Sequence, residues 1–417
     1  MRRSLLAATL AATLLAPWPA LTQQGDEQSF DVIDRGRYLA MVGDCVACHT
    51  IPGGTPYAGG RAIATPFGSL LTPNLTPDQA TGIGSWTDDQ FVRAMQQGIA
   101  ANGDHLYPAF PYPYYTRVTR QDALAIRAWL ATLQPVRNPV VTNQLPFPFN
   151  IRASLIAWNA MFFTPGDFVP HADKSAEWNR GGYFFEGLAH CGACHTPKNL
   201  LGGDKNSQAL QGYDLQGWVA PSLTIDARTG IGAWSAEDIV EYLKTGRNQI
   251  HAASGPMAEV IDYTTSRMHD ADLWAIAAYL RDPPQGVATT SGTAPAAVSR
   301  SDPAMQVGAA VYLDSCAACH TQSGAGIARL FPALAHAAAI QQDDPASLVH
   351  VVLRGARAVA TGNAPTGPAM PSFAWKLDDT QVAAVLTYIR NEWGNAAPAV
   401  SASTVAAARV GLTEPEQ

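Results

Sequence analysis

The sequence predicts an all-α protein built from three tandem domains. One pattern, Cys-x-x-Cys-His, occurs three times in the 417 residues. Each copy follows a short apolar segment and precedes a closing amphipathic segment of helical period. Repetition of a whole segment is the sequence signature of duplicated structural units. The chain is long enough for two or three domains that each bury a core, so three helical domains are expected.

The composition is that of a globular, loop-rich protein, with 47% hydrophobic residues, 15% charged residues, 35 Gly and 30 Pro. A net charge of -7 argues against a nucleic acid partner, because phosphate binding needs concentrated Lys and Arg. Arg2 and Arg3 precede an apolar stretch from Leu5 to Leu15, which is typical of a secretory signal, here predicted over residues 1–20. Later apolar runs are too short to span a bilayer, so any membrane association is expected to be peripheral.

All six cysteines belong to the repeated pattern. Two thiols separated by two residues can both bond to the vinyl groups of one haem, and the next residue then places an imidazole beneath the iron. The pattern therefore predicts three covalent haem c groups with a histidine as proximal iron ligand in each. The three sets are Cys45, Cys48 and His49; Cys191, Cys194 and His195; and Cys316, Cys319 and His320.

Other uses of paired cysteines are disulfide bonds, zinc sites and thioredoxin-like redox pairs. Neither disulfide nor zinc chemistry requires a histidine directly after the second cysteine in three separate copies. A zinc ribbon would also place two such motifs much closer together in the chain. The pattern favours haem over these alternatives.

The segment before each motif is expected to form the first helix of its domain. Gly36, Gly182 and Gly308 lie near the start of these segments. In the first copy, Val32, Gly36 and Leu39 recur at helical spacing, which would let another helix approach closely.

Further helices are expected after Trp86 and Trp234, in the matching stretches TGIGSWTDDQ and TGIGAWSAED. Thr87 with Gln90, and Ser235 with Asp238, have the spacing of N-terminal capping pairs. The third copy lacks this signature, but Asp344 and Pro345 suit the N-cap and first turn of a helix.

Each copy ends in an amphipathic helix that should pack across the first one. The segments between copies set the predicted boundaries, and the tail is expected to be disordered or a weak surface helix. These boundaries are a signal peptide (1–20), a first domain (26–134), an apolar connector (135–178), a second domain (179–281), a flexible linker (282–303), a third domain (304–394) and a tail (395–417).

A second axial ligand should come from the side of each haem opposite the histidine. A methionine thioether there favours reduced iron and raises its potential. Met370 lies in the loop GPAMPSFA before the closing helix of the third domain, and Met257 lies at the same stage of the second. Both could instead be core residues, since methionine fills gaps readily, but their surroundings favour iron ligation.

The first domain breaks this pattern, because its loop NGDHLYPAFPYPYY contains no methionine. Alignment on the two tryptophans puts Phe110 one residue from the place of Met257. His105 lies in the right loop and is the candidate ligand, against a five-coordinate iron or a distant Met161. Met95 falls on the apolar face of a helix and is expected in the core.

With these motifs, together with LYPAFPY, LPFPFN and EDIVEYLKTGRN, the chain resembles the tri-haem cytochrome c subunit of bacterial membrane-bound dehydrogenases. The resemblance implies three tandem class I cytochrome c-like domains and no catalytic site of its own. It implies a large dehydrogenase subunit with a quinone, flavin or molybdopterin cofactor, room for a small third subunit, and ubiquinone or a terminal oxidase as acceptor. The implied location is periplasmic, at the outer face of the cytoplasmic membrane.

Two rival functions remain open from the residues. A haem enzyme of the peroxidase kind would use an open first haem, and a free periplasmic shuttle would form no stable complex. The apolar connector around Trp158 and Phe162 either packs between domains or forms a docking surface for the dehydrogenase or the quinone.

Overall fold

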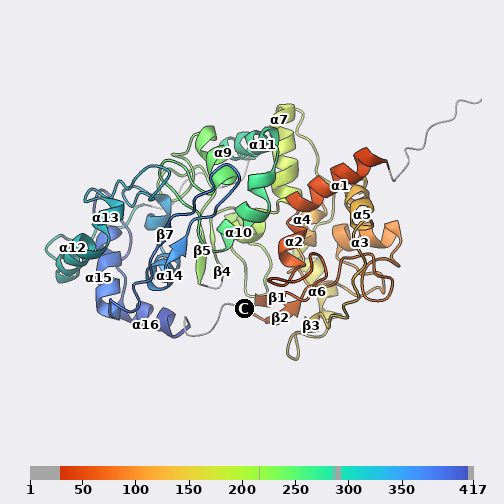
Figure 1. The fold of residues 1–417 in the computed structure, drawn as a ribbon, viewed down its shortest axis with the longest axis horizontal. Helices are drawn as coiled ribbons and strands as arrows, with labels where there is room; N and C mark the ends of the chain where they lie inside the picture. Colours follow the sequence, from red (N-terminus) through yellow and green to blue (C-terminus); the bar gives the residue numbers. More distant parts are fainter. Residues whose placement is uncertain (1–28, 216, 285–286, 288–292, 412–417) are drawn as a thin grey trace, which may run out of the picture.

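The computed structural model describes residues 29–215, 217–284, 287 and 293–411. Three mainly helical units follow one another along the longest axis of the molecule (Figure 1). The predicted signal segment and residues 285–286 and 288–292 of the predicted linker lie outside the described residues. Within the described ranges, every helix is too short or too polar to cross a membrane.

The first unit combines helices with a short antiparallel sheet. Strand β3 comes from the connector and pairs with β2, Ser69 opposite Gln144, so the connector is tied to the first unit by its backbone. The prediction of an all-α fold missed this sheet, because its strands have only two to four residues. The elements are α1 (Phe30–Val42), α2 (Cys45–Cys48), β1 (Ala62–Thr65), β2 (Gly68–Leu71), α3 (Asp88–Gln97), α4 (Tyr112–Tyr115), α5 (Arg120–Leu130), β3 (Asn143–Gln144) and α6 (Ser154–Phe162).

The second unit repeats the order from α1 to α5 with several changes. Its first helix, α7, runs into a π-helical turn, η1, and a longer helix, α10, follows the hairpin after α9. The elements are α7 (Ala176–Tyr183), η1 (Phe184–Leu188), α8 (Gly192–His195), η2 (Asn206–Gln208), β4 (Tyr213–Leu215), β5 (Trp218–Ala220), α9 (Ala236–Thr245), α10 (Pro256–Tyr263), η3 (Thr265–Arg267) and α11 (Asp270–Arg281).

The third unit is followed by a helical tail. The tail helix α16 packs on α14 and α15 with Val405 fully buried, and Arg409 bonds Asp379 at 2.7 Å. Of the two structures predicted for the tail, disorder is therefore wrong for residues 402–411 and a helix is confirmed, which is docked on the third unit. The elements are α12 (Pro303–Ser315), α13 (Ala317–His320), η4 (Ala338–Gln341), α14 (Ala346–Arg354), β6 (Ala356–Arg357), β7 (Ala369–Met370), α15 (Asp379–Ile389) and α16 (Ala402–Gly411).

The predicted helix starts are confirmed at two of the three places. Reciprocal capping boxes, Thr87 with Gln90 and Ser235 with Asp238, begin α3 and α9. Helix α14 begins at Ala346, one residue later than expected. The Asp344 carboxylate still accepts the Ala346 N–H at 2.8 Å, so it satisfies one of the otherwise unpaired donors of the first turn.

The first and last helices of each unit cross at a glycine, as predicted for the first copy. A Cβ at Gly36, Gly181 or Gly308 would overlap a backbone carbonyl of the closing helix, at Ala125, Ala275 and Ala384 respectively. In the second unit the crossing residue is Gly181 rather than Gly182. Its π-helical turn lengthens the path from this crossing to the first cysteine.

The connector helix α6 packs between the first two units. The Trp158 indole N–H donates to the Leu201 carbonyl at 2.8 Å, and Asn159 accepts the hydroxyl of Tyr112 at 2.5 Å. Ile156 and Met161 on the same helix are nonetheless 57% and 59% exposed. Interdomain packing is thus confirmed for part of this helix, and an exposed apolar face remains.

Replacing Gly36 with alanine is expected to lower the free energy of unfolding by about 3 kcal/mol, because overpacking a close contact costs about 1–3 kcal/mol or more. Chemical denaturation followed by circular dichroism would measure the loss. Gly362→Ala is the matched control, since a Cβ there meets open space. Equal stabilities of the two variants would contradict the crossing as a close contact.

Candidate haem centres

The three cysteine pairs lie on or beside single-turn helices, α2, α8 and α13. All six cysteines are described, and no disulfide joins any two of them. Burial raises the pKa of Cys45 and of Cys191 to about 12. An apolar setting of this kind disfavours the thiolate that zinc binding or disulfide exchange requires. The burial of Cys45 and Cys191 therefore argues against zinc or disulfide chemistry at these two thiols.

The histidine of each motif is held by a backbone carbonyl from a proline. His49 Nδ1 lies 2.7 Å from the Pro73 oxygen, and His195 Nδ1 lies 2.7 Å from the Pro221 oxygen. In the third unit, His320 Nδ1 lies 2.9 Å from the oxygen of Pro332. A carbonyl oxygen can only accept, so Nδ1 carries the proton in all three rings.

Burial also lowers the pKa of all three rings, that of His49 to about 4. Each ring is therefore neutral near pH 7, with its lone pair on Nε2. An oriented neutral imidazole of this kind is what haem iron takes as an axial ligand. The residues present fit a haem in each unit.

The three proline acceptors were not predicted from the sequence. They follow their histidines at separations of 24, 26 and 12 residues, so no shared spacing marks them. The only signal available was a proline downstream of each motif, and 30 prolines in the chain make that signal weak.

The two predicted methionines occupy different local structures. Met257 is half-buried in the first turn of α10, rather than in a loop, and Met370 is half-buried in strand β7. Met370 packs against a buried cluster that includes Val352 and Leu377. Both lie between the middle and closing helices of their units, where an axial ligand is required.

In the first unit, Phe110 is half-buried beside Tyr115, with ring centroids 5.4 Å apart. His105 pairs through its backbone with Ile99, and its Nδ1 lies 3.4 Å from the Asn159 amide of α6. Met95 is 5% exposed in the core, as expected, and Met161 lies on the surface of α6. Iron ligation by His105 stays a prediction.

The first two units are joined by a reciprocal pair of buried carboxylates. Each aspartate is at most 3% exposed, accepts from an arginine of its own unit and accepts from a tyrosine of the other unit. This arrangement relates the two units by an approximate two-fold symmetry. The two sets are Asp122 with Arg35 and Tyr183, and Asp272 with Arg180 and Tyr38.

The same symmetry brings the haem-attachment helices of these units together. Helix α10, which carries Met257, packs on α2 of the first unit, where Arg61 bonds both Glu259 and the Ala47 carbonyl at 2.5 Å. Conversely, Tyr114 of α4 packs against Gly192 of α8. Each unit thus covers the cysteine-bearing helix of its neighbour.

Asp44, the residue before Cys45, lies at this same contact and accepts from the Thr264 hydroxyl of the second unit at 3.0 Å. Burial raises the pKa of its carboxyl to about 7. The first attachment helix is therefore fixed to the second unit by polar contacts on both of its sides.

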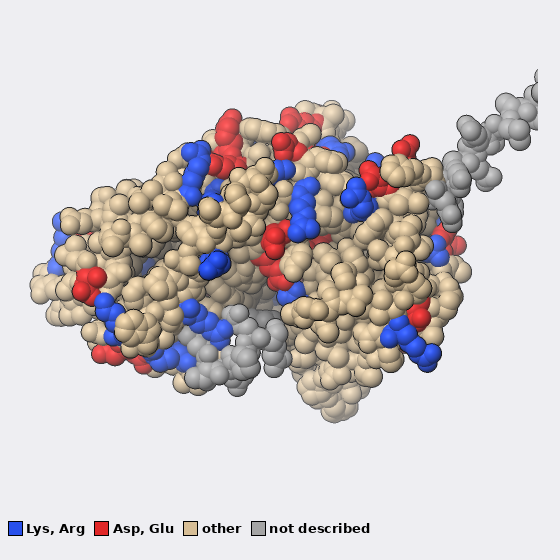
Figure 2. Space-filling view, in the orientation of Figure 1, with Lys and Arg blue, Asp and Glu red and all other residues tan. Residues whose placement is uncertain are grey.

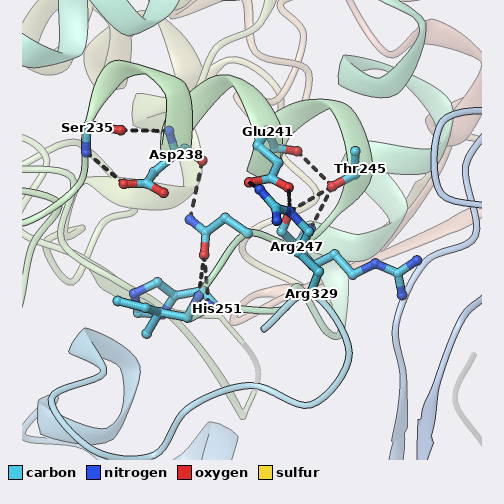
Figure 3. A network of polar contacts seen from close by, with 9 residues as sticks. Ser235, Asp238, Glu241, Thr245, Arg247, His251 and Arg329 are labelled. Atoms are coloured by element: carbon cyan, nitrogen blue, oxygen red, sulfur yellow. Dashed lines mark hydrogen bonds and ion pairs between the residues drawn. The ribbon is translucent and has the colours of Figure 1, made fainter. Parts of the chain in front are cut away.

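The second and third units meet along α9 (Figure 3). Glu241 of α9 pairs with Arg329, and the ring of Trp218 lies 4.2 Å from that of His350. Arg247 is 7% exposed, and its Nη1 has no hydrogen-bond partner among the described residues. A buried guanidinium with a spare donor suits a carboxylate such as a haem propionate. A small, open pocket of about 40 Å³ in the same region is lined by His251 and His336 among others.

A family model for cytochrome c matches residues 33–134, 180–282 and 305–393. The gluconate 2-dehydrogenase cytochrome c subunit of Pantoea cypripedii is 40% identical, with 98% of this chain and 95% of that protein covered. The cytochrome c subunit of alcohol dehydrogenase (quinone) from Gluconobacter oxydans is 38% identical over 96% of this chain and 86% of its own length. The fructose dehydrogenase cytochrome subunit of Gluconobacter japonicus is 38% identical over 91% and 83%.

Replacing Cys191 and Cys194 together with serine should reduce the covalently bound haem from three to two per chain, because these thiols have no counterpart elsewhere in their unit. Pyridine haemochrome absorbance against protein concentration would measure the ratio. Retention of three haems after acid–acetone extraction would contradict attachment at this pair.

Proposed function

Because this chain belongs to the family of cytochrome c subunits of bacterial dehydrogenases, we propose that it takes electrons from a separate large dehydrogenase subunit and passes them to ubiquinone or a terminal oxidase. The chain carries three covalent haem c groups and functions in electron transfer. The observation that carries the proposal is the same oriented, buried imidazole in all three units.

The three haem sites are built from the residues of the repeated pattern. Each cysteine pair anchors the haem edge, each histidine provides Nε2 to the iron, and each proline carbonyl fixes the ring. Met257 and Met370 provide thioethers to the second and third haems. Each bound haem supplies a one-electron iron couple. The crossed first and last helices around each site support assignment to the class I cytochrome c type.

The packing of the units supports a relay. The first two attachment helices lie against elements of the opposite unit, through Arg61 with Glu259 and through Tyr114 with Gly192. Between the second and third units, Trp218 packs against Gly255, near Met257, and reaches His350 of α14. These direct contacts between consecutive units support close spacing of the proposed haem sites.

The family and one surface of the chain support the proposed location and acceptor. The lobe beneath β3 shows no charged side chain in the view of Figure 2. In the connector, Phe147 is 79% exposed. An uncharged, aromatic surface supports peripheral contact with the outer face of the cytoplasmic membrane. A quinone, flavin or molybdopterin in the partner subunit, and a small third subunit, are all compatible with this arrangement.

Replacing Met257 with leucine is expected to lower the midpoint potential of one haem out of three, because a thioether ligand favours reduced iron. Spectroelectrochemical titration would resolve the change. Met95→Leu is the matched control, since Met95 is a buried core residue of α3. Three unchanged potentials in Met257→Leu would rule out Met257 as a ligand.

Purification from the native membrane should retain a large dehydrogenase subunit. Adding that subunit's substrate under anaerobic conditions should then reduce the haems of the complex, while the isolated chain stays oxidised. A chain that purifies alone and is not reduced by such a subunit would contradict the proposal and favour a free shuttle. Rapid consumption of peroxide by the isolated chain would instead favour a haem enzyme.

A further inference from the structure

The first unit carries a phenylalanine at the place where the third carries its candidate methionine ligand. The stretch Pro108, Ala109, Phe110, Pro111 repeats the stretch from Pro368 to Pro371, with Phe110 at the position of Met370. In both units the stretch lies shortly before the N-cap of the closing helix. The two stretches differ only at this residue, so the comparison singles out residue 110 as the position where the first unit lacks a methionine.

A comparison of backbone pairing in the first and second units leads to the same residue, Phe110. Ile99 bridges to His105, and Arg247 bridges to Ala252, directly after the glycines that end α3 and α9. The Leu106 N–H donates to Gly98 at 2.7 Å, and the Ala253 N–H donates to Gly246 at 2.8 Å.

Five residues beyond the bridge, the first unit has Phe110 and the second has Met257. The hairpin of residues 99–105 is one residue longer than that of residues 247–252. This extra residue accounts for the single-residue offset in the sequence alignment, so Phe110 and Met257 lie at the same number of residues after the bridge.

The surroundings of Phe110 connect it to the first haem-attachment segment. Phe110 and Cys45 both pack against one buried cluster, to which Tyr115 belongs. The Tyr115 hydroxyl donates at 2.8 Å to the carbonyl of Gly43, two residues before Cys45. A benzyl side chain has no lone pair to offer a metal, so this position cannot supply a ligand as methionine does.

In the register with the second unit, the rival donor His105 does not lie at the position of Met257. His105 corresponds to Ala252, and the connector holds it through Asn159 and through Arg152, which donates to its carbonyl at 2.8 Å. In the third unit, however, Met370 is itself the bridge partner of Ala356. His105 is therefore the alternative that an experiment must exclude.

We propose that the first haem lacks a protein ligand on its distal side, and that Phe110 leaves there an apolar site for a small neutral molecule such as carbon monoxide. This inference rests on the proposed assignment of Cys45, Cys48 and His49 to the first haem. The absence of a thioether also sets the potential of this haem below the potentials of the other two.

The test is a titration of the full chain, with its three haems reduced by dithionite, against carbon monoxide. Changes in Soret absorbance and the infrared C–O stretch report binding and its stoichiometry. We expect one carbon monoxide per chain, with two haems unaffected. Three unreactive haems would overturn the inference.

Phe110→Met should abolish this binding and raise the lowest of the three potentials. Phe110→Leu is the matched control, because leucine is apolar and cannot ligate, and it should still bind one carbon monoxide. Continued binding in Phe110→Met, with the potentials unchanged, would contradict the role given to residue 110.

The variant His105→Ala tests the remaining alternative, in which His105 is the distal ligand of the first haem. Its carbon monoxide stoichiometry should equal that of the unaltered chain, whereas binding that appears only in His105→Ala would identify His105 as the ligand and overturn the inference. Failure of this inference is distinguishable from failure of the proposed function. A chain with three closed haems would still be reduced within a dehydrogenase complex.

Discussion

The close crossing of the first and last helices at a glycine is the constraint on which each unit depends. The number of residues from that glycine to the first cysteine differs between the three units, and a π-helical turn makes it largest in the second. The three imidazoles nevertheless reach proline carbonyls at 2.7–2.9 Å. The crossing, rather than a fixed count of residues, therefore keeps the attachment helix and its histidine in place.

Above the level of single units, two buried carboxylates determine the arrangement. Asp122 and Asp272 each receive donors from both units, which offsets the cost of burying their charge. Removing one partner of a buried ion pair typically costs about 3–5 kcal/mol. The third unit has Gln381 at the corresponding helical position, three residues after the N-cap, where it only completes a capping box. It therefore joins the second unit differently, through contacts such as Glu241 with Arg329.

Local patterns were predictable and distant ones were not. The capping boxes at Thr87 and Ser235, and the buried Met95, depend on neighbouring residues that the sequence displays. The proline acceptors, the carboxylate contacts between units and the docking of Val405 depend on residues brought together only by folding. Phe110 belongs partly to each class. The sequence shows that the loop lacks a methionine, but only the length of the hairpin in the structure shows that residue 110 is the position to compare with Met257.

Because the first two units pack together, the presence of Phe110 in the first unit, where the second has Met257, affects electron transfer between them. Helix α10, with Met257 in its first turn, lies on the attachment helix of the first unit, so the two haem segments are neighbours. Close neighbours exchange electrons in a direction set by their potentials rather than by their separation. With the proposed ligation, a thioether on the second haem and none on the first would make the second haem the stronger oxidant. Electrons entering at the first haem would then move to the second, and a methionine at position 110 would reduce the difference in potential between the two haems.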